Sequence, residues 1–405
     1  MQSEALLSKI VNKMEGLSKP RKNFIKTMLI LYLSLRGRYT FKGMERYGDR
    51  CEKTFRLHFE QRFDFLDFNL ELSKGHLSGD RLIVFDPCYL PKSGKSTAGV
   101  GKFFSGASAR LINGIEIGAL AVVDIKQKTA INLEAIQTPN ALELTARKKT
   151  LVGHYAQLII ERWDKLGQLS SYVAVDGWFS KKSFVDPIME STNLHLICKL
   201  RSDANLRYLY NGPKRQGKGR PKHYDGKVNL KQIDKEKFKC FYQDQHVILY
   251  QAALWSVFLK RKINLVYAQS LKQGKTTRGY TLYYSTDLDL DPWRIYQYYK
   301  ARFQIEFLFR DAKQHTGLTH CQARSQNKIH FHTNMALTAV GVAKIAHYFN
   351  ENKEQKTPFS MANIKTRYFN ELMLNLFFSN LQINPKLIKN RDAIHKLMNF
   401  GRIAA

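Results

Sequence analysis

Apolar positions in the first 75 residues recur at helical spacing, which predicts a helical N-terminal region. Pro20 interrupts this pattern, a second helix is expected over about 23–35, and Thr40 is a candidate cap for a short helix. After a turn at Gly48, a basic helix is expected over 51–60. Helix, glycine turn and basic helix is the outline of a helix-turn-helix, although an ordinary helical bundle fits the same pattern.

At about residue 80 the pattern changes to short apolar runs rich in β-branched residues, which predict buried strands. Residues 81–85 and 171–175 are two such runs, and they end at acids, Asp86 and Asp176 respectively. The expected order of elements up to residue 200 is β-β-β-α-β-α-β. A mixed sheet in this order, with acids at the ends of its first and fourth strands, is the pattern of a ribonuclease H-like α/β fold.

Three further features of this region carry expectations. A glycine- and lysine-rich loop is expected over 93–106, but its residues lack the spacing G-x4-G-K-[ST], which excludes a phosphate loop of the NTPase type. One long helix is expected over 141–166. Asp124 ends another apolar run, and we interpret it as a solvated strand end rather than as a rival catalytic acid.

Residues 199–231 interrupt the α/β pattern with ten Lys and Arg against two Asp, which predicts a loop or flexible basic arm. The stretch 236–287 contains β-rich runs without a crossover helix, so an antiparallel β-rich insertion is expected. A long helix follows over about 293–315. The predicted domains are a helical region over 1–75, the first part of the α/β core over 76–204, a β-rich insertion over 205–290, a core helix over 291–325 and a helical C-terminal region over 326–405.

The composition predicts a negatively charged partner. Lys and Arg number 65 against 34 Asp and Glu, a net charge of +31, which favours nucleic acid as the partner, with an anionic membrane surface second. An apolar share of 44% excludes a wholly disordered chain. Five widely spaced cysteines without a C-x-x-C pair argue against a disulfide framework and a zinc ribbon. No apolar run near the start is long enough to span a membrane, so we expect a cytoplasmic protein.

The expected helix over 293–315 is apolar nearly all round, which predicts a buried helix, apart from one polar stripe. At about 100° per residue, an arc of about 80° holds every member of the stripe: Tyr299, Arg302, Glu306, Arg310 and Lys313. An Arg302–Glu306 ion pair alone would explain this stripe structurally. In the functional interpretation, Glu306 joins Asp86 and Asp176 to hold two Mg²⁺ ions for phosphodiester cleavage.

In this stretch the sequence resembles the DDE transposases of bacterial insertion sequences, in the large group known as insertion-sequence family four. The signature of that group is Y-(2)-R-(3)-E-(6)-K, and Tyr299, Arg302, Glu306 and Lys313 match it without a spacing departure. The surrounding residues, YYKARFQIEFLFRDAKQHTGL, also resemble the group. The resemblance covers residues 80–320 and does not extend clearly to either end of the chain.

The resemblance implies a site and a set of partners. Asp86, Asp176 and Glu306 would form the metal-binding triad, with Mg²⁺ as the ion and Mn²⁺ as a substitute. The partners would be double-stranded DNA, both transposon ends and target, and a second copy of the chain, in the bacterial cytoplasm at the nucleoid and not at a membrane. Residues expected to contact DNA are Tyr299, Arg302, Arg310 and Lys313 near the triad, Lys214, Arg215, Lys218 and Arg220 on the basic arm, and Trp255 as a stacking platform for a flipped base.

Two alternatives to a transposase remain open on the sequence. One is another ribonuclease H-like nuclease, which would cut without joining strands. The other is a catalytically inactive, transposase-derived DNA-binding protein, although the presence of all three acids argues against it.

Overall fold

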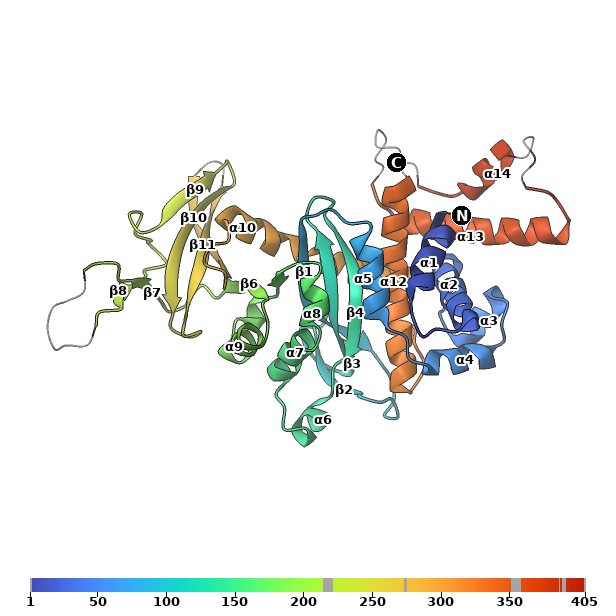
Figure 1. Ribbon diagram of the computed structural model, residues 1–405, viewed down its shortest axis with the longest axis horizontal. Helices are drawn as coiled ribbons and strands as arrows, with labels where there is room; N and C mark the ends of the chain where they lie inside the picture. Colours follow the sequence, from blue (N-terminus) through green and yellow to red (C-terminus); the bar gives the residue numbers. More distant parts are fainter. Residues whose placement is uncertain are drawn as a thin grey trace.

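One large mixed sheet runs through the molecule, with helices at both ends of the chain gathered at one side of it (Figure 1). The computed structural model describes residues 2–213, 221–272, 275–350, 358–385, 387 and 391–403. The prediction of a ribonuclease H-like mixed α/β fold with helical N- and C-terminal regions is confirmed.

The N-terminal region is helical, as expected. Pro20 lies in the first turn of its second helix and does not break it, because the missing N–H of proline is tolerated there. Thr40 caps the third helix by accepting a hydrogen bond from the N–H of Gly43 at 3.1 Å. The five helices are α1 (Gln2–Lys13), α2 (Lys19–Ser34), α3 (Phe41–Tyr47), α4 (Glu52–Glu60) and α5 (Phe65–Lys74).

The core part of the sheet has the strand order β2-β3-β1-β5-β6, with β4 also paired to β3. The β1–β5 and β5–β6 pairs are parallel and the others are antiparallel. These strands are β1 (Arg81–Pro91), β2 (Gly101–Ser105), β3 (Arg110–Asp124), β4 (Thr129–Gln137), β5 (Tyr172–Ala174) and β6 (His195–Leu200).

Three expectations about this core were wrong. The first strand does not end at Asp86 but continues to Pro91, because β3 pairs with it along its whole length. The loop expected over 93–106 contains β2. Asp124 is fully buried rather than solvated, since its carboxylate accepts hydrogen bonds from the N–H groups of Ser78 and Gln127 at 2.6 and 2.8 Å.

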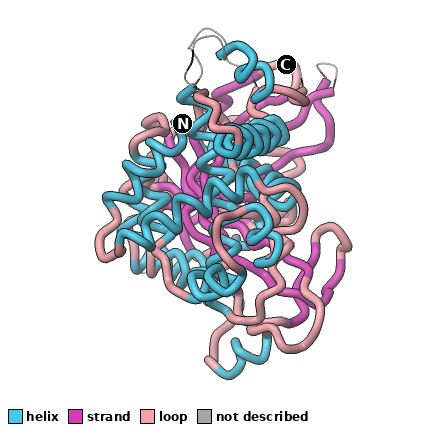
Figure 2. The backbone as a smooth tube through the Cα atoms, turned by 90° about the vertical axis from the view of Figure 1, so that its right-hand side faces the viewer, coloured by secondary structure: helices cyan, strands magenta, loops and turns pink. Residues whose placement is uncertain are grey.

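Helices cover both faces of the core sheet. On one face Phe85 packs against Tyr155 of α7 (Leu151–Ile160), with ring centroids 5.3 Å apart, and α9 (Lys182–Ser191) packs beside α7. The other face carries α11 (Gln304–His315), which contacts β1, β3 and β4, while α5 and α12 (Gln326–Asn350) contact β4. Figure 2 views the molecule from the end with the terminal helical regions, where helices lie in front of the strands.

The helix expected over 141–166 is three helices: α6 (Ala141–Ala146), α7 and α8 (Trp163–Gly167). Lys148 adopts a left-handed conformation, with φ of 53°, and Thr150 then caps α7 through the N–H of Gly153. A left-handed residue ends a helix, and a capping residue begins the next. The apolar spacing alone shows neither event.

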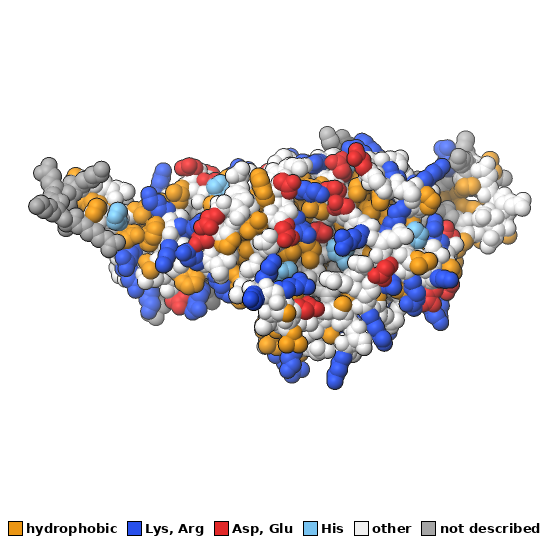
Figure 3. All heavy atoms as spheres, turned by 60° about the horizontal axis from the view of Figure 1, so that its bottom comes forward, with side chains coloured by type: hydrophobic (Ala, Val, Ile, Leu, Met, Phe, Trp, Pro, Cys, Tyr) orange, Lys and Arg blue, Asp and Glu red, His pale blue; other side chains and the backbone are white. Residues whose placement is uncertain are grey.

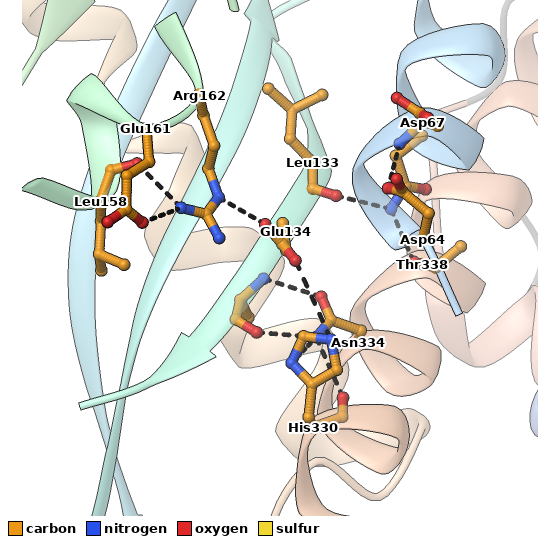
Figure 4. A network of polar contacts seen from close by, with 12 residues as sticks. Asp64, Asp67, Leu133, Glu134, Leu158, Glu161, Arg162, His330, Asn334 and Thr338 are labelled. Carbon is orange, nitrogen blue, oxygen red and sulfur yellow. Dashed lines mark hydrogen bonds and ion pairs between the residues drawn. The ribbon is translucent and has the colours of Figure 1, made fainter. Parts of the chain in front are cut away.

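The outer strand of this part, β4, is held at its edge by α12 (Gln326–Asn350). The fully buried side chain of Asn334 pairs with both backbone groups of Ala135, with each hydrogen bond 2.7 Å long. Next to this pair, Glu134 accepts a hydrogen bond from Arg162 Nε at 2.6 Å and lies 3.9 Å from His330 Nε2 (Figure 4). This polar network satisfies strand groups that would otherwise be unpaired.

The β-rich stretch continues the same sheet, because β12 pairs with β6 of the core. Its strands are antiparallel to one another, as expected for 236–287, but β7 and β8 lie within 199–231, where no strand was expected. The elements are β7 (Leu206–Leu209), β8 (Tyr224–Lys227), β9 (Lys239–Gln243), β10 (Val247–Ser256), β11 (Arg261–Lys272) and β12 (Lys275–Ser285).

The helix expected over 293–315 is divided into α10 (Pro292–Ala301) and α11 (Gln304–His315) by a turn at residues 302–303, both of which keep right-handed helical backbone angles. The helix is also not apolar and buried all round, because Phe303 and Phe307 are 46% and 44% exposed. The C-terminal region adds α13 (Met361–Asn380) and α14 (Arg391–Met398). Over the described ranges, no helix is long and apolar enough to cross a membrane.

Candidate active site

Asp86 lies on β1 just past the residues that pair in parallel with β5, which end at Val84. Side chains alternate between the two faces of a strand, so Asp86 points away from the face on which Phe85 meets α7. The carboxylate of Asp86 therefore points to the face covered by α11. There, the distance from its Oδ1 to Arg302 Nη1 is 3.8 Å.

Asp176 follows β5 and precedes a short 3₁₀ helix (Gly177–Phe179). Its side chain does not cap that helix, so the carboxylate is left for other partners. Tyr299 of α10 donates its hydroxyl to Asp176 Oδ1 at 3.4 Å. The thiol of Cys198 binds the backbone carbonyl of Asp176 at 3.1 Å, which fixes this turn against β6.

Arg302, at the break between α10 and α11, lies among all three predicted acids. Its Nη2 donates to Glu306 Oε1 at 3.2 Å, and its Nη1 is near Asp86. The residue is only 4% exposed. Burial lowers the pKa of Arg302, but nearby acidic groups, Asp86 first and Asp176 and Glu306 among them, raise it overall. The guanidinium is a buried cation placed to compensate several carboxylates.

Asp86 is the acid whose protonation is most perturbed at this site. Burial raises the pKa of Asp86 to about 7, Arg302 opposes that rise, and Glu306 and Asp176 add to it. A pKa this high means that the nearby positive charge, including that of Arg302, does not fully stabilise the ionised form of the carboxyl group. Sites with perturbed acids in a polar cleft are candidates for catalysis.

The donor set fits a hard divalent cation in its chemistry. Asp86, Asp176 and Glu306 supply carboxylate oxygens from a strand, a turn and a helix, and oxygen is the ligand that Mg²⁺ prefers. The spacing is not that of a closed site, because no three His, Cys, Asp or Glu side chains in the described part of the chain converge on one point. Arg302 lies between Asp86 and Glu306 instead.

The remaining cations of the predicted stripe lie on α11. Lys313 lies beside the buried thiol of Cys88, two residues beyond Asp86, and opposes the rise that burial causes in the pKa of Cys88, to about 11. Arg310 donates to its neighbour Asp311 at 3.1 Å and lies over the ring of Phe307. Lys313 therefore lies beside β1 two residues from Asp86, and Arg310 is exposed on α11.

The sequence interpretation missed residues around the acids. Glu116 is buried on β3, accepts a hydrogen bond from Tyr155 and adds to the rise in the pKa of Asp86. Phe303 and Phe307 are exposed on either side of Glu306, with Arg302 over the first ring and Arg310 over the second. In the sequence, these rings were indicated only by their spacing from basic residues: Phe303 follows Arg302, and Phe307 lies three residues before Arg310.

Trp255, the predicted stacking platform, lies away from the acids, in the β-rich stretch. Trp255 on β10 is paired across the sheet with Arg207 and Lys262, and its ring centroid is 5.5 Å from that of Tyr224. None of the contacts found among the described residues joins Trp255 to the acids. The four predicted basic residues of the arm, Lys214, Arg215, Lys218 and Arg220, lie outside the described residues.

Comparison with known proteins identifies a family. Residues 127–341, just over half of the chain, match the family model described as "Transposase DDE domain". The match includes Asp176, the β-rich stretch and both helices of the signature, and it begins after Asp86. No curated protein sequence matches the chain significantly. With an aspartate on a strand, an aspartate in the turn after β5 and a glutamate on a helix gathered around one arginine, and with this match, the chain belongs to the family of DDE-domain transposases.

Proposed function

We propose that this chain is a cut-and-paste DNA transposase of insertion-sequence family four. It would bind the inverted repeats at transposon ends, cut the DNA and join the 3′-hydroxyl to target DNA. The observation that carries the proposal is the position of Arg302. That residue belongs to the Tyr299, Arg302, Glu306, Lys313 signature, and it lies between Glu306 and Asp86.

We infer that Asp86, Asp176 and Glu306 hold divalent metal ions, Mg²⁺ or Mn²⁺. When bound, such ions activate the attacking oxygen and stabilise the leaving oxygen of a phosphodiester. Asp86 and Asp176 are presented by the sheet, which fixes their positions, whereas Glu306 is in the first turn of α11 and half exposed. For Glu306 to join Asp86 and Asp176 as a metal ligand, its ion pair with Arg302 would have to break. The side chain of Glu306 is half exposed, so it has room to move.

The signature cations would hold the DNA backbone at this site. Arg302 carries a planar guanidinium that suits phosphate oxygens, and metal ions at the acids would free it for that contact. Tyr299, bonded to Asp176, positions that carboxylate. Lys313 adds a positive charge on the same side, beside Cys88.

DNA beyond the cut would be held by other parts of the chain. We propose that the region 1–75 reads the transposon ends, and that the insertion over 205–290 grips the backbone through its basic arm and stacks a flipped base on Trp255. Arg310, in the core helix region 291–325, would add a further contact to the DNA backbone. The region 326–405 would be a helical C-terminal region. Pairing two ends implies a homodimer on DNA, in the bacterial cytoplasm at the nucleoid.

The experiment that tests the triad uses DNA carrying the sequences that flank the gene. Asp86→Asn and Glu306→Gln should each abolish Mg²⁺-dependent cutting and leave DNA binding largely intact, because each removes a metal ligand without changing the shape of the side chain. Glu161→Gln, an exposed acid on another surface, is the matched control and should cut like the wild type.

Strand joining in the same reaction separates a transposase from another ribonuclease H-like nuclease. Normal cutting by both Asp86→Asn and Glu306→Gln would refute the triad. Cutting by the wild type without joining to a target duplex would refute the transposase mechanism and leave a nuclease.

A further inference from the structure

The hairpin of β2 and β3 carries an exposed apolar pair at the edge of the core sheet. Phe104 and Leu111 lie opposite each other in its register, and they are 60% and 62% exposed. The other face of the hairpin is anchored, since Phe103 and Ser105 are buried there. The exposed pair is therefore presented by a packed hairpin and not by a frayed end.

This pair shares a face of the sheet with a catalytic acid. Asp86 pairs with Ala119 of β3, and Leu111 is eight residues from Ala119 along an unbroken register with β1 and β2. Alternate residues of a strand face the same side, so Leu111 faces the same side as Asp86. Eight residues of strand span about 27 Å, which is the length of about eight base pairs of duplex.

The surroundings of the pair are basic. Residues 101–114 contain Lys102 and Arg110 and no acid. Lys102 is exposed on the same face as Phe104, two residues before it. The side chain of Asn140 binds the backbone carbonyl of Val100 at 3.1 Å, which places the start of α6 against the start of β2.

α6 begins on the Phe103 side of the hairpin, where Asn140 lies against Gly101, and the turn after α6 adds three consecutive exposed cations at this end of the molecule: Arg147, Lys148 and Lys149. Figure 1 places β2 and α6 together at the lower end of the core. Figure 3 brings that end forward, and Lys and Arg side chains protrude along its lower margin with apolar side chains between them.

We propose that the β2–β3 hairpin is a second DNA-contacting element, which inserts Phe104 and Leu111 into the minor groove of the duplex held at the acids. The inference rests on the proposed function, because it places the same DNA across both sites. Apolar side chains flanked by cations act as wedges between base steps and bend the duplex. The contact would lie about eight base pairs from the cut phosphate.

A second copy of the chain fits this surface less well. β2 is at the end of the sheet, so its edge has no strand partner among the described residues. An edge lysine such as Lys102 opposes pairing with another strand. The excess of cations around Phe104 and Leu111 would also repel an identical surface, whereas it complements the phosphates of DNA.

The test measures bending and affinity on a mixed-sequence duplex of about 40 base pairs, four helical turns, with fluorophores at its ends. The wild type should shorten the end-to-end distance, and the double variant Phe104→Ser/Leu111→Ser should lose the bend and bind several-fold more weakly. Lys102→Ala should lower the salt dependence of binding by about one phosphate contact. Phe400→Ser, an equally conspicuous exposed phenylalanine in the C-terminal region, is the matched control and should bend DNA like the wild type.

Three outcomes would overturn the proposal. The first is an unchanged bend in the double variant. The second is a change in the sedimentation of DNA-free protein without a change in bending, which would make the hairpin a protein interface. The third outcome has two parts. The double variant loses its native melting transition, so that its lost bend reflects misfolding, and a milder variant, Leu111→Thr, bends DNA normally. The bend is measured without metal, so an absence of Mg²⁺-dependent cutting would count against the proposed function and not against the hairpin.

Discussion

At the scale of single residues, one buried guanidinium organises the site. Arg302 bonds Glu306, lies near Asp86 and is affected by the charge of Asp176, so three elements far apart in the sequence meet around it. The sequence spacing predicted its ion pair with Glu306, which is present. It did not predict that Arg302 stands at a helix break, because neither Pro nor Gly occurs between Ala301 and Gln304.

Arg302→Met tests this arrangement. Removing the cation takes away the charge that opposes the rise in the pKa of Asp86, so Asp86 of the metal-free variant should stay protonated at pH 8, where it is ionised in the wild type, and the variant should lose about 1 kcal/mol of unfolding free energy at that pH. Mg²⁺ should raise the melting temperature of the variant more than that of the wild type, because bound ions replace the missing charge.

Thermal melts with and without Mg²⁺ measure both effects. Arg310→Met, which removes an exposed guanidinium from α11, is the control and should respond to Mg²⁺ like the wild type. The same Mg²⁺ response in Arg302→Met and the wild type would contradict the compensating role of Arg302.

At the scale of elements, periodicity located most helices and strands but not their ends. It placed Asp86 at a strand end because Pro87 follows, whereas pairing with β3 carries the strand to Pro91, five residues beyond Asp86. It merged α6, α7 and α8 because their apolar spacing continues across a left-handed residue at Lys148. The end of β1 depends on pairing with a strand distant in the sequence, and the end of α6 depends on the backbone angle of one residue. Neither can be predicted from the local spacing of apolar residues.

The helices at the two ends of the chain are joined by a buried histidine. His332 of α12 accepts a hydrogen bond from the hydroxyl of Tyr32 on α2, and its Nε2 binds the backbone carbonyl of Gly317, each at 2.8 Å. Burial lowers the pKa of His332 to about 4, the Gly317 carbonyl opposes this shift, and His320 and Lys92 add to it. The neutral ring is therefore the form that the fold requires.

A pH dependence of stability follows from His332. The ordinary pKa is about 6.5, so the unfolded chain binds this proton more readily, and the stabilisation is complete above pH 6.5 and lost as the pH falls toward 4. Between pH 7.5 and 5 this residue should cost about 2 kcal/mol of unfolding free energy. Urea unfolding at both pH values measures it. His332→Gln should show a smaller loss than the wild type, and an equal loss would contradict the assignment.

At the scale of the whole molecule, the helical ends form one body and the sheet joins the core to the β-rich stretch. Lys365 of α13 donates to the backbone carbonyls of Tyr32 and Leu35 on α2, at 3.0 and 2.6 Å, so the predicted regions 1–75 and 326–405 pack together. The sequence patterns of these two regions did not predict this contact, because Lys365 and its partners on α2 are more than 300 residues apart. The pairing of β12 with β6 makes the insertion a continuation of the core sheet.

The excess of positive charge is distributed over these joined parts. Part of it lies at the acids, in Arg302 and Lys313, and part lies at the β2–β3 hairpin and the turn after α6. A duplex that contacts both places would run over α11, which covers the face of the sheet to which Asp86 points. Composition alone predicted an acidic partner, and the fold indicates the face on which that partner would lie.

Iron-mediated cleavage of the protein backbone tests whether Asp86, Asp176 and Glu306 hold the same metal ions. Fe²⁺ replaces Mg²⁺ at the DNA-bound protein, and added peroxide then cuts the chain next to the bound ion. We expect cuts near residues 86, 176 and 306 together, which excess Mg²⁺ suppresses and Asp86→Asn weakens at all three places. Cuts that leave any one of these segments intact, or that persist in Asp86→Asn, would contradict a shared metal site.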